Sequence, residues 1–444
     1  MTESHLQPKK GNFPLGKFIF FLFIALAGTA GGYWQFYQPN SSVNQQALLA
    51  IPETKDPYTA FAEEIYDGIK ENYWEKIEDD KLSEIFRLAA EKQTGTSQIL
   101  VSKDKAGVTT LIGQLTKDQT TEKKKERVTG IADLVLSNLQ PFGRSRLYTS
   151  KQEKKLRETV ENIDSTTDLY ATLGIEKDAT PEQIKETYQK KSAELKKDTS
   201  PEAAKKLALL DRAFEALATP EKKENYDKTG AEPTVTYKLV HPDIFYMRLT
   251  KFSPQSFDEL RKAANTIDPK QKNGPTTLIF DLRANIGGAI DILQYFLGPF
   301  IGPDRYAYDF FHQGDTTPYK TKVGWLESLV RYKKVVILID EKSQSSAEVM
   351  AATLKKYNAG ILVGTKTKGW GTVEQIFPIK QQLNPDESYS VMLVHSLTLR
   401  DDGQPIEGRG IEPTVNINDK DWTKQLTSYF NYPELIQAIK EVLK

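Results

Sequence analysis

The C-terminal half of the chain alternates between short apolar runs and helical patterns, and this alternation restricts the possible folds more than any other feature. The apolar runs have the length of buried strands, and turns and helical patterns separate them. Repeated strand–turn–helix–strand units build a sheet with helices packed on it. We therefore expect an α/β (α+β) core over residues 233–415 and a C-terminal helical segment over 416–444. The expected strands are 244–249, 276–283, 335–340 and 361–364.

Two turns of this core have the composition of a reactive site. One contains Gly287-Gly288, where paired glycines let the backbone approach another group closely and direct its N–H groups at an oxyanion. The other places Ser345 between a buried strand and a helix, where its hydroxyl would be exposed near a helix N-terminus and suited to act as a nucleophile. Each turn has an ordinary alternative, because the glycines can form a simple turn and the serine can cap the helix.

Composition excludes several classes of site. The 444 residues contain 60 Lys and Arg against 60 Asp and Glu, so no net charge favours nucleic acid, which we do not expect as a partner. The chain contains no cysteine, which rules out disulfides, thiolate catalysis and cysteine-based zinc sites. It contains four histidines, too few for a His-rich metal site. We therefore expect no metal and no cofactor.

Residues 18–37 are almost wholly apolar and end in aromatic residues, as a membrane span does at the headgroup boundary. Lys9, Lys10 and Lys17 precede this segment, and no Lys or Arg follows it before Lys55. This asymmetry predicts a single-pass anchor with residues 1–17 in the cytoplasm, a linker over 38–56 and the bulk of the chain extracytoplasmic. The alternative is a signal peptide that is cleaved near Ala25-Leu26-Ala27.

Residues 57–163 are expected to form a helical domain. Its first helix shows apolar residues every four positions, and further helices are expected around 131–139 and over 151–163. Ser150 and Glu153 have the spacing of a capping box at the start of the last helix. The charged run 117–127 is interpreted as a solvated loop. The apolar positions of the first helix are Phe61, Ile65, Ile69, Tyr73 and Ile77.

Residues 164–230 form a separate small helical unit. Thr180-Pro181 begins one helix and Ser200-Pro201 the next, so the two make an antiparallel hairpin, and Thr219-Pro220 begins a short third helix. From Asp168 to Asp227 this unit resembles a J domain, the co-chaperone module that stimulates DnaK-type chaperones. In that family the turn between the two long helices carries His-Pro-Asp, whereas here it reads Lys196-Lys197-Asp198. We therefore expect a spacer or protein-contact module, without a DnaK-type chaperone as partner.

Residues 235–415 resemble the carboxy-terminal-processing (tail-specific) serine protease family. The resemblance implies a polypeptide substrate and a Ser–Lys dyad, in which burial makes the lysine neutral so that it can take the serine proton. The family normally has a substrate-binding PDZ domain where this chain has the J-like unit. The motifs that carry the resemblance are Tyr246, Phe252-Ser253, Asp281-Leu282-Arg283, Gly287-Gly288, Ser343, Ser345 and Glu348, 364–373 and 408–413.

The resemblance places the nucleophile at Ser345 and the oxyanion donors at the N–H groups of Gly288 and Ser346. It places the family's lysine at Trp370 and its orienting glutamine at Glu374. Tryptophan cannot be the base, because the indole N–H only donates a hydrogen bond. The substitute bases considered are Lys368, two residues from the vacant position, and Lys366, His395 and His312.

These residues lead to three hypotheses. The first is a catalytically degenerate member of the family, an extracytoplasmic scaffold that binds extended polypeptide. The second is an active serine endopeptidase that uses Ser345 with a relocated base such as Lys368. The third, a membrane co-chaperone, is opposed by the missing His and Pro. The distance from Ser345 to a lysine or histidine nitrogen separates the first two, because a base must lie within about 3 Å or one water.

Overall fold

The computed structural model describes residues 56–268 and 274–443. The expected anchor at 18–37 and nearly all of the linker lie outside these residues. No helix within the described part of the chain has the length and apolar character needed to cross a membrane.

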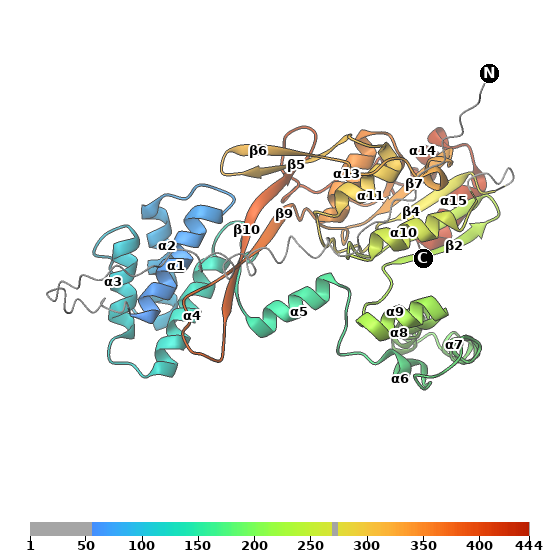
Figure 1. Ribbon diagram of the computed structural model, residues 1–444. Coiled ribbons are helices and arrows are strands. Elements are labelled where there is room, and N and C mark those ends of the chain that lie inside the picture. Colours follow the sequence, from blue (N-terminus) through green and yellow to red (C-terminus); the bar gives the residue numbers. More distant parts are fainter. Residues whose placement is uncertain (1–55, 269–273, 444) are drawn as a thin grey trace, which may run out of the picture. The chain divides into compact units, whose positions relative to one another are not determined.

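Four helices form the first part of the described chain (Figure 1): α1 (Pro57–Asn72), α2 (Asp79–Thr94), α3 (Lys105–Thr116) and α4 (Thr121–Ser137). The apolar positions expected for the first helix are all buried, but α1 ends at Asn72. Tyr73 and Ile77 reach the same core from the segment that follows, so the expected helix was too long. Helices α2 and α3 were not predicted.

Two expectations about this region were wrong in detail. The charged run 117–127 is not a loop throughout, because α4 begins at Thr121 and Thr120 caps it. Helix α5 (Ser150–Val160) has its capping box one residue earlier than expected, between Thr149 and Gln152. The reason is that Thr149 ends the strand β1 (Arg146–Thr149) with an extended backbone, which is the conformation that a cap requires.

The J-like unit contains α6 (Leu169–Leu173), α7 (Pro181–Leu195), α8 (Pro201–Leu217) and α9 (Pro220–Thr229). The three expected helix starts are confirmed, with Thr180, Ser200 and Thr219 as caps. Helices α7 and α8 pack on a small core in which the rings of Tyr188 and Phe214 stack with their centroids 4.0 Å apart.

The core expected from the strand–helix alternation is a six-stranded sheet in the order β11-β8-β7-β4-β3-β2. Only the β2–β3 pair is antiparallel. Alternate strand residues face two separate apolar clusters, so helices cover both faces. The strands are β2 (Val235–His241), β3 (Ile244–Leu249), β4 (Thr277–Asp281), β7 (Lys334–Ile339), β8 (Ile361–Gly364) and β11 (Val415–Asn416).

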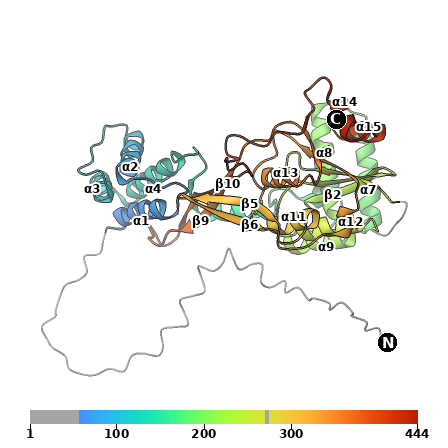
Figure 2. The same ribbon diagram turned by 90° about the horizontal axis from the view of Figure 1, so that it is seen from above.

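One face of this sheet carries α10 (Ser256–Asn265), α11 (Leu293–Ile301) and α13 (Ser346–Lys356), with the short α12 (Glu327–Val330) beside them. The other face carries α14 (Trp422–Tyr429) and α15 (Pro433–Val442), which form the expected C-terminal helical segment. These helices can be followed in Figures 1 and 2. The mixed α/β core is confirmed.

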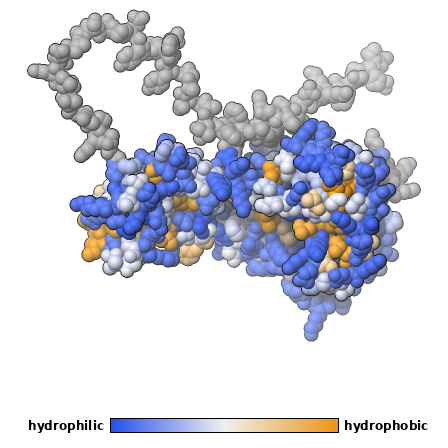
Figure 3. Space-filling model, turned by 90° about the horizontal axis from the view of Figure 1, so that it is seen from below, coloured by the Kyte–Doolittle hydropathy of each residue, from blue (hydrophilic) through white to orange (hydrophobic). Residues whose placement is uncertain are grey.

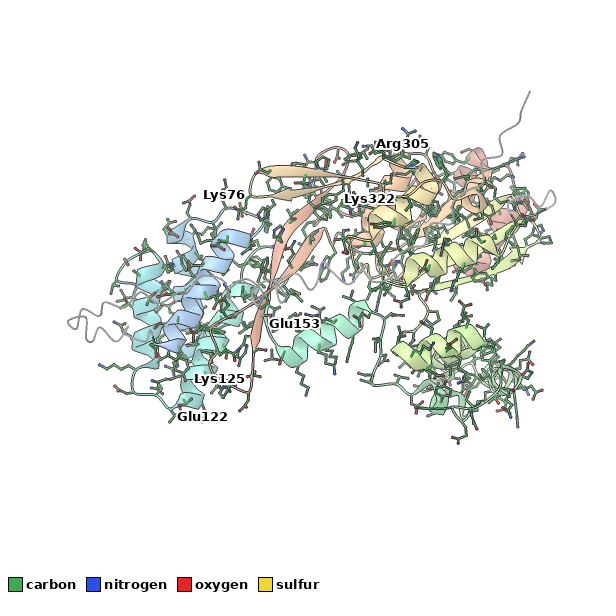
Figure 4. All side chains as sticks on the ribbon, viewed as in Figure 1. Lys76, Glu122, Lys125, Glu153, Arg305 and Lys322 are labelled. Carbon is green, nitrogen blue, oxygen red and sulfur yellow. The ribbon has the colours of Figure 1, made fainter. Side chains whose placement is uncertain are left out.

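A second sheet, which was not predicted, has the order β1-β10-β5-β6, with β9 also paired to β10. Its long strand β10 joins the core of the four N-terminal helices. Lys125 on α4 forms an ion pair with Glu387 (2.6 Å), and Glu153 on α5 accepts a hydrogen bond from Ser390 (2.8 Å). Figure 4 labels Lys125 and Glu153. The other strands are β5 (Tyr306–His312), β6 (Asp315–Lys320), β9 (Thr372–Pro378) and β10 (Tyr389–Leu399).

Candidate active site

Ser345 lies directly before α13, at the junction between strand β7 and the helix, as the sequence predicted. Its backbone has φ +56°, a left-handed conformation that is rare for a residue with a side chain. Two acceptors hold this conformation, because the Ser345 N–H points at the carbonyl oxygen of Trp370 (3.1 Å) and at the carboxylate of Glu348 (2.9 Å). The surrounding contacts therefore fix the serine in a strained turn.

Gly287 and Gly288 lie against this serine. A Cβ added to Gly287 would be 2.6 Å from Cβ of Ser345, so only glycine permits the approach. The Ser346 hydroxyl donates to the carbonyl oxygen of Gly288 (3.1 Å) and ties the two turns together. The N–H groups of Gly288 and Ser346 donate to no acceptor within 56–268 and 274–443, which leaves both available for an oxyanion.

The glycine turn is supported from the segment 251–255. The N–H of Phe252 donates to Gly287 (2.9 Å), and the carbonyl oxygen of Phe252 accepts from the N–H of Ala289 (2.9 Å). The next residue, Ser253, donates its hydroxyl hydrogen bond to the carbonyl oxygen of Val160 (2.6 Å), at the end of α5. The J-like unit begins a few residues after Val160. The chain just before that unit is therefore hydrogen-bonded to Ser253, the neighbour of the residue that holds the glycine turn.

Glu348 is the central acceptor of the site, although the sequence analysis gave it no role beyond the motif. Its side chain is fully buried, and its two oxygens accept four hydrogen bonds. The donors are the Thr367 hydroxyl (2.5 Å) and the N–H groups of Gly369 (2.7 Å), Trp370 (2.7 Å) and Ser345 (2.9 Å). Burial raises the pKa of the Glu348 carboxyl, and these hydrogen bonds oppose the rise. The spacing Ser345-x-x-Glu348 is the feature of the sequence from which this role could have been predicted.

Trp370 lies in the loop before β9, with its backbone against Ser345 and its side chain held by other groups. The Arg144 guanidinium carbon lies 3.3 Å from the indole ring centroid, in a cation–π contact. The indole Nε1–H donates to a carboxylate oxygen of Glu374 at 3.3 Å. Glu374 also accepts from the Thr372 hydroxyl (2.6 Å), and burial raises the pKa of its carboxyl.

Arg144 was missed by the sequence analysis. It follows α4, more than two hundred positions before Trp370, and nothing in its local sequence marks it. Its guanidinium forms an ion pair with Glu407 (2.8 Å), and Glu407 accepts from the N–H of Gly371 (2.7 Å). The indole is thus held between an anchored arginine and the half-buried Glu374.

Two family models match parts of this chain. The model of "Peptidase family S41" matches residues 243–417, which include the Ser345 turn, the glycine turn and Trp370. Residues 243–417 belong to peptidase family S41. A "DnaJ domain" model matches residues 168–227, the J-like unit.

The curated relatives of this S41 domain include carboxy-terminal-processing proteases. One from Bartonella bacilliformis is 28% identical over 178 residues, which cover 40% of this chain and 39% of the relative. The protease CtpB of Bacillus subtilis is 28% identical over 189 residues, covering 42% and 36%. This chain therefore spans less than half the length of these relatives. The photosystem II D1 C-terminal processing protease aligns in structure over 81% of this chain and 93% of its own, with 15% identity and a TM-score of 0.46.

The substitute bases considered for the S41 domain lie in different surroundings. Nζ of Lys368 is 5.0 Å from the Trp370 ring centroid, and the side chain is exposed. Lys366 is exposed and pairs with Glu412 (2.8 Å). His312 and His395 stack on each other with centroids 4.2 Å apart, and burial lowers the pKa of His395 to about 4. Among the hydrogen bonds and ring contacts of the described residues, neither histidine contacts Ser345.

Proposed function

We propose that this protein is a membrane-anchored, extracytoplasmic member of the carboxy-terminal-processing serine protease family that binds extended polypeptide without hydrolysing it. The observation that carries the proposal is the side chain at position 370. An indole occupies the place that the family resemblance gives to the lysine, and Arg144 and Glu374 hold it there. A Ser345 hydroxyl without a base is a poor nucleophile, because general-base help is worth about 10²–10⁴-fold in rate.

The proposed binding of a polypeptide carbonyl is supported by two backbone N–H groups. Gly288 and Ser346 have N–H groups without acceptors in the described part of the chain, and the Ser346–Gly288 hydrogen bond keeps them together. Two N–H groups aimed at one oxygen can hold a carbonyl whether or not a proton is transferred. The J-like unit is assigned the role of a contact module, because its turn carries Lys196-Lys197 in place of His-Pro.

One observation favours a second function, an active serine endopeptidase with Lys368 as the base. The ammonium of Lys368 lies 5.0 Å from the centre of the indole, so it is near the position that the lysine of the family would occupy. The exposure of Lys368 opposes this function, because burial is what makes a lysine neutral enough to accept a proton.

Membrane anchoring is part of the proposal and is supported by the sequence of residues 18–37 and the lysines that precede them. Carbonate extraction of membranes that contain the full chain measures it directly. An integral protein remains in the pellet, whereas a protein released by cleavage of a signal peptide appears in the supernatant with a shortened N-terminus.

The decisive experiment measures cleavage and binding of an unfolded polypeptide by the detergent-solubilised full chain. The variants are Ser345→Ala, Lys368→Ala and, as a matched control, Lys366→Ala, which removes another exposed lysine of the same loop. The proposal expects binding and no cleavage in all four proteins. Cleavage by the wild type that is lost in Ser345→Ala and Lys368→Ala, but kept in Lys366→Ala, establishes the endopeptidase instead.

A further inference from the structure

The loop that joins α2 to α3 presents two apolar side chains to solvent. Ile99 is 83% exposed and Val101 is 69% exposed, the largest values for large hydrophobic residues in the described part of the chain. Leu88, on α2, is 50% exposed. Single exposed apolar residues are normal on a protein surface, but a cluster of them marks an interaction site. Figure 3 also shows apolar residues on the domain that α1–α4 form.

A hydrogen bond joins α2 to this loop. The Arg87 guanidinium on α2 donates a hydrogen bond to the carbonyl oxygen of Gln98 (3.2 Å). Leu88 and Ile99 are each one residue beyond this hydrogen bond along the chain. We call Leu88, Ile99 and Val101 the apolar tip.

The loop that carries the apolar tip is fixed on both sides. The N–H of Gln98 donates to Glu91 on α2 (3.0 Å), and Leu100 packs against the buried core of the helices. On the other side Asp104 caps α3 by accepting from the N–H of Gly107 (2.9 Å). A Cβ on Gly107 would lie 1.8 Å from the carbonyl oxygen of Ser102, so glycine is required for the loop to pack on the helix. An ordered loop therefore holds Ile99 and Val101 outward while Leu100 points inward.

The sequence outside the described residues indicates what covers the tip. Residues 18–37 form the apolar segment proposed as the anchor, and the linker 38–56 separates it from α1. Fully extended, that linker spans roughly 65 Å at about 3.4 Å per residue, so the helical domain cannot leave the neighbourhood of the bilayer. A tether of this length keeps the helical domain at a high effective concentration near the lipid surface. At such a concentration even a small apolar surface can be occupied by lipid.

Charges around the tip do not select a lipid headgroup. Lys92, Lys103 and Lys105 are close in sequence, but Lys105 pairs with Asp67 (2.9 Å) and acidic residues stand among them. Attraction to anionic lipid is therefore weak, and burial of apolar area in the boundary between headgroups and acyl chains is the driving force.

From these observations we infer that the apolar tip inserts into the lipid surface and orients the extracytoplasmic domains against the membrane. The inference rests on the proposed anchor. It assigns a lipid-binding surface to the α2–α3 loop, with Ile99 and Val101 as the inserting side chains and a zwitterionic bilayer as a sufficient partner.

The absence of cysteine from the chain makes a direct test possible. Ile99→Cys in the full chain is labelled with an environment-sensitive fluorophore and reconstituted into phosphatidylcholine vesicles. Leu239→Cys is the matched control, because Leu239 on β2 is 54% exposed but lies outside the tip. We expect a blue shift of emission and quenching by a lipid-attached quencher at position 99, and neither at position 239.

A second reporter position makes the test independent of Ile99→Cys, which replaces one of the inserting side chains. Leu88→Cys keeps Ile99 and Val101 and should show the same shift. Adding Ile99→Asp and Val101→Asp to that reporter should abolish the shift, while the melting temperature changes little because both side chains are exposed.

The outcomes separate the inference from the anchor on which it rests. A chain that floats with the vesicles but shows no quenching at position 99 overturns the tip insertion and leaves the anchor intact. A chain that does not float overturns both. A blue shift that grows with protein density and is insensitive to the lipid quencher means that a second copy covers the tip, and it overturns the membrane as the partner.

Discussion

The double substitution Trp370→Lys with Glu374→Gln tests whether residues 370 and 374 together silence the site. The indole Nε1 lies 3.3 Å from a carboxylate oxygen of Glu374, so a lysine ammonium at position 370 would find an acceptor close by. Opposite charges about 4 Å apart attract by about 4 kcal/mol at an effective dielectric constant near 20, which holds the lysine in its charged form. Trp370→Lys alone is therefore expected to remain inactive.

Replacing Glu374 with glutamine removes that charge and restores the side chain that the family resemblance places there. Arg144 then acts in the opposite direction, because a guanidinium beside the new lysine disfavours its protonated form. General-base assistance by a neutral lysine is expected to raise hydrolysis by about 10²–10⁴-fold over the unaltered chain, which has Ser345 but no base in this proposal. Loss of the cation–π contact costs about 0.5–2 kcal/mol, a fall of a few degrees in Tm that leaves the domain folded.

The assay is cleavage of an unfolded polypeptide and of tail peptides by the full chain near pH 8, with each protein's Tm measured in parallel. Trp370→Phe is the matched control, because it keeps an aromatic ring over Arg144 and removes the indole N–H. Activity in the double variant that disappears on adding Ser345→Ala supports the reasoning. Equal activity in Trp370→Phe, or a folded but inactive double variant, refutes it.

Three further results are expected. Glu348→Gln places an amide NH₂ where backbone N–H groups donate, so it should lower the unfolding free energy by about 2–4 kcal/mol. A loss below about 0.5 kcal/mol in a denaturant titration contradicts the role given to this carboxylate. The pKa of His395 is lowered to about 4 by burial and by His312, so the unfolded chain binds this proton more readily, and stability is lost as the pH falls from about 6.5 toward 4. His395→Gln should flatten this dependence in melting curves, by about 1–2 kcal/mol for a half-exposed ring, and an unchanged pH profile would count against it. Lys196→His with Lys197→Pro should confer stimulation of a DnaK-type chaperone in solution, where sidedness does not matter; stimulation by the unaltered chain would return the co-chaperone hypothesis.

The sequence predicted those parts of the fold that local rules determine. Strand 244–249 and the cap at Thr180 follow from composition and spacing over a few residues, and both are confirmed. The first helix was drawn too long because Tyr73 continues the four-residue period from outside the helix. A buried loop residue and a buried helix residue give the same pattern in sequence, and only tertiary packing distinguishes them.

The second sheet and half of the candidate site depend on long-range contacts. Strand β9 has a mixed pattern of burial and finds its partner in β10, whose hydrophobic side joins the N-terminal helices. Arg144 reaches Trp370 across more than two hundred residues, and Glu407 fixes it from a third segment. No window of the sequence contains these residues together, so spacing rules could not join them.

Apart from position 370, the site contains groups that are costly to keep. Ser345 holds a left-handed backbone and Glu348 is a buried carboxylate with four donors, features that reduce stability unless the surrounding contacts fix them. Trp370 packs on Arg144, and under the proposed function it supplies no base, while the N–H groups of Gly288 and Ser346 donate to no acceptor in the described residues. The proposed function thus assigns carbonyl recognition and proton transfer to different groups, and only the second depends on residues 370 and 374. A polypeptide can therefore be bound at this site after the chemistry is lost, which is the physical basis for a scaffold built on a peptidase fold.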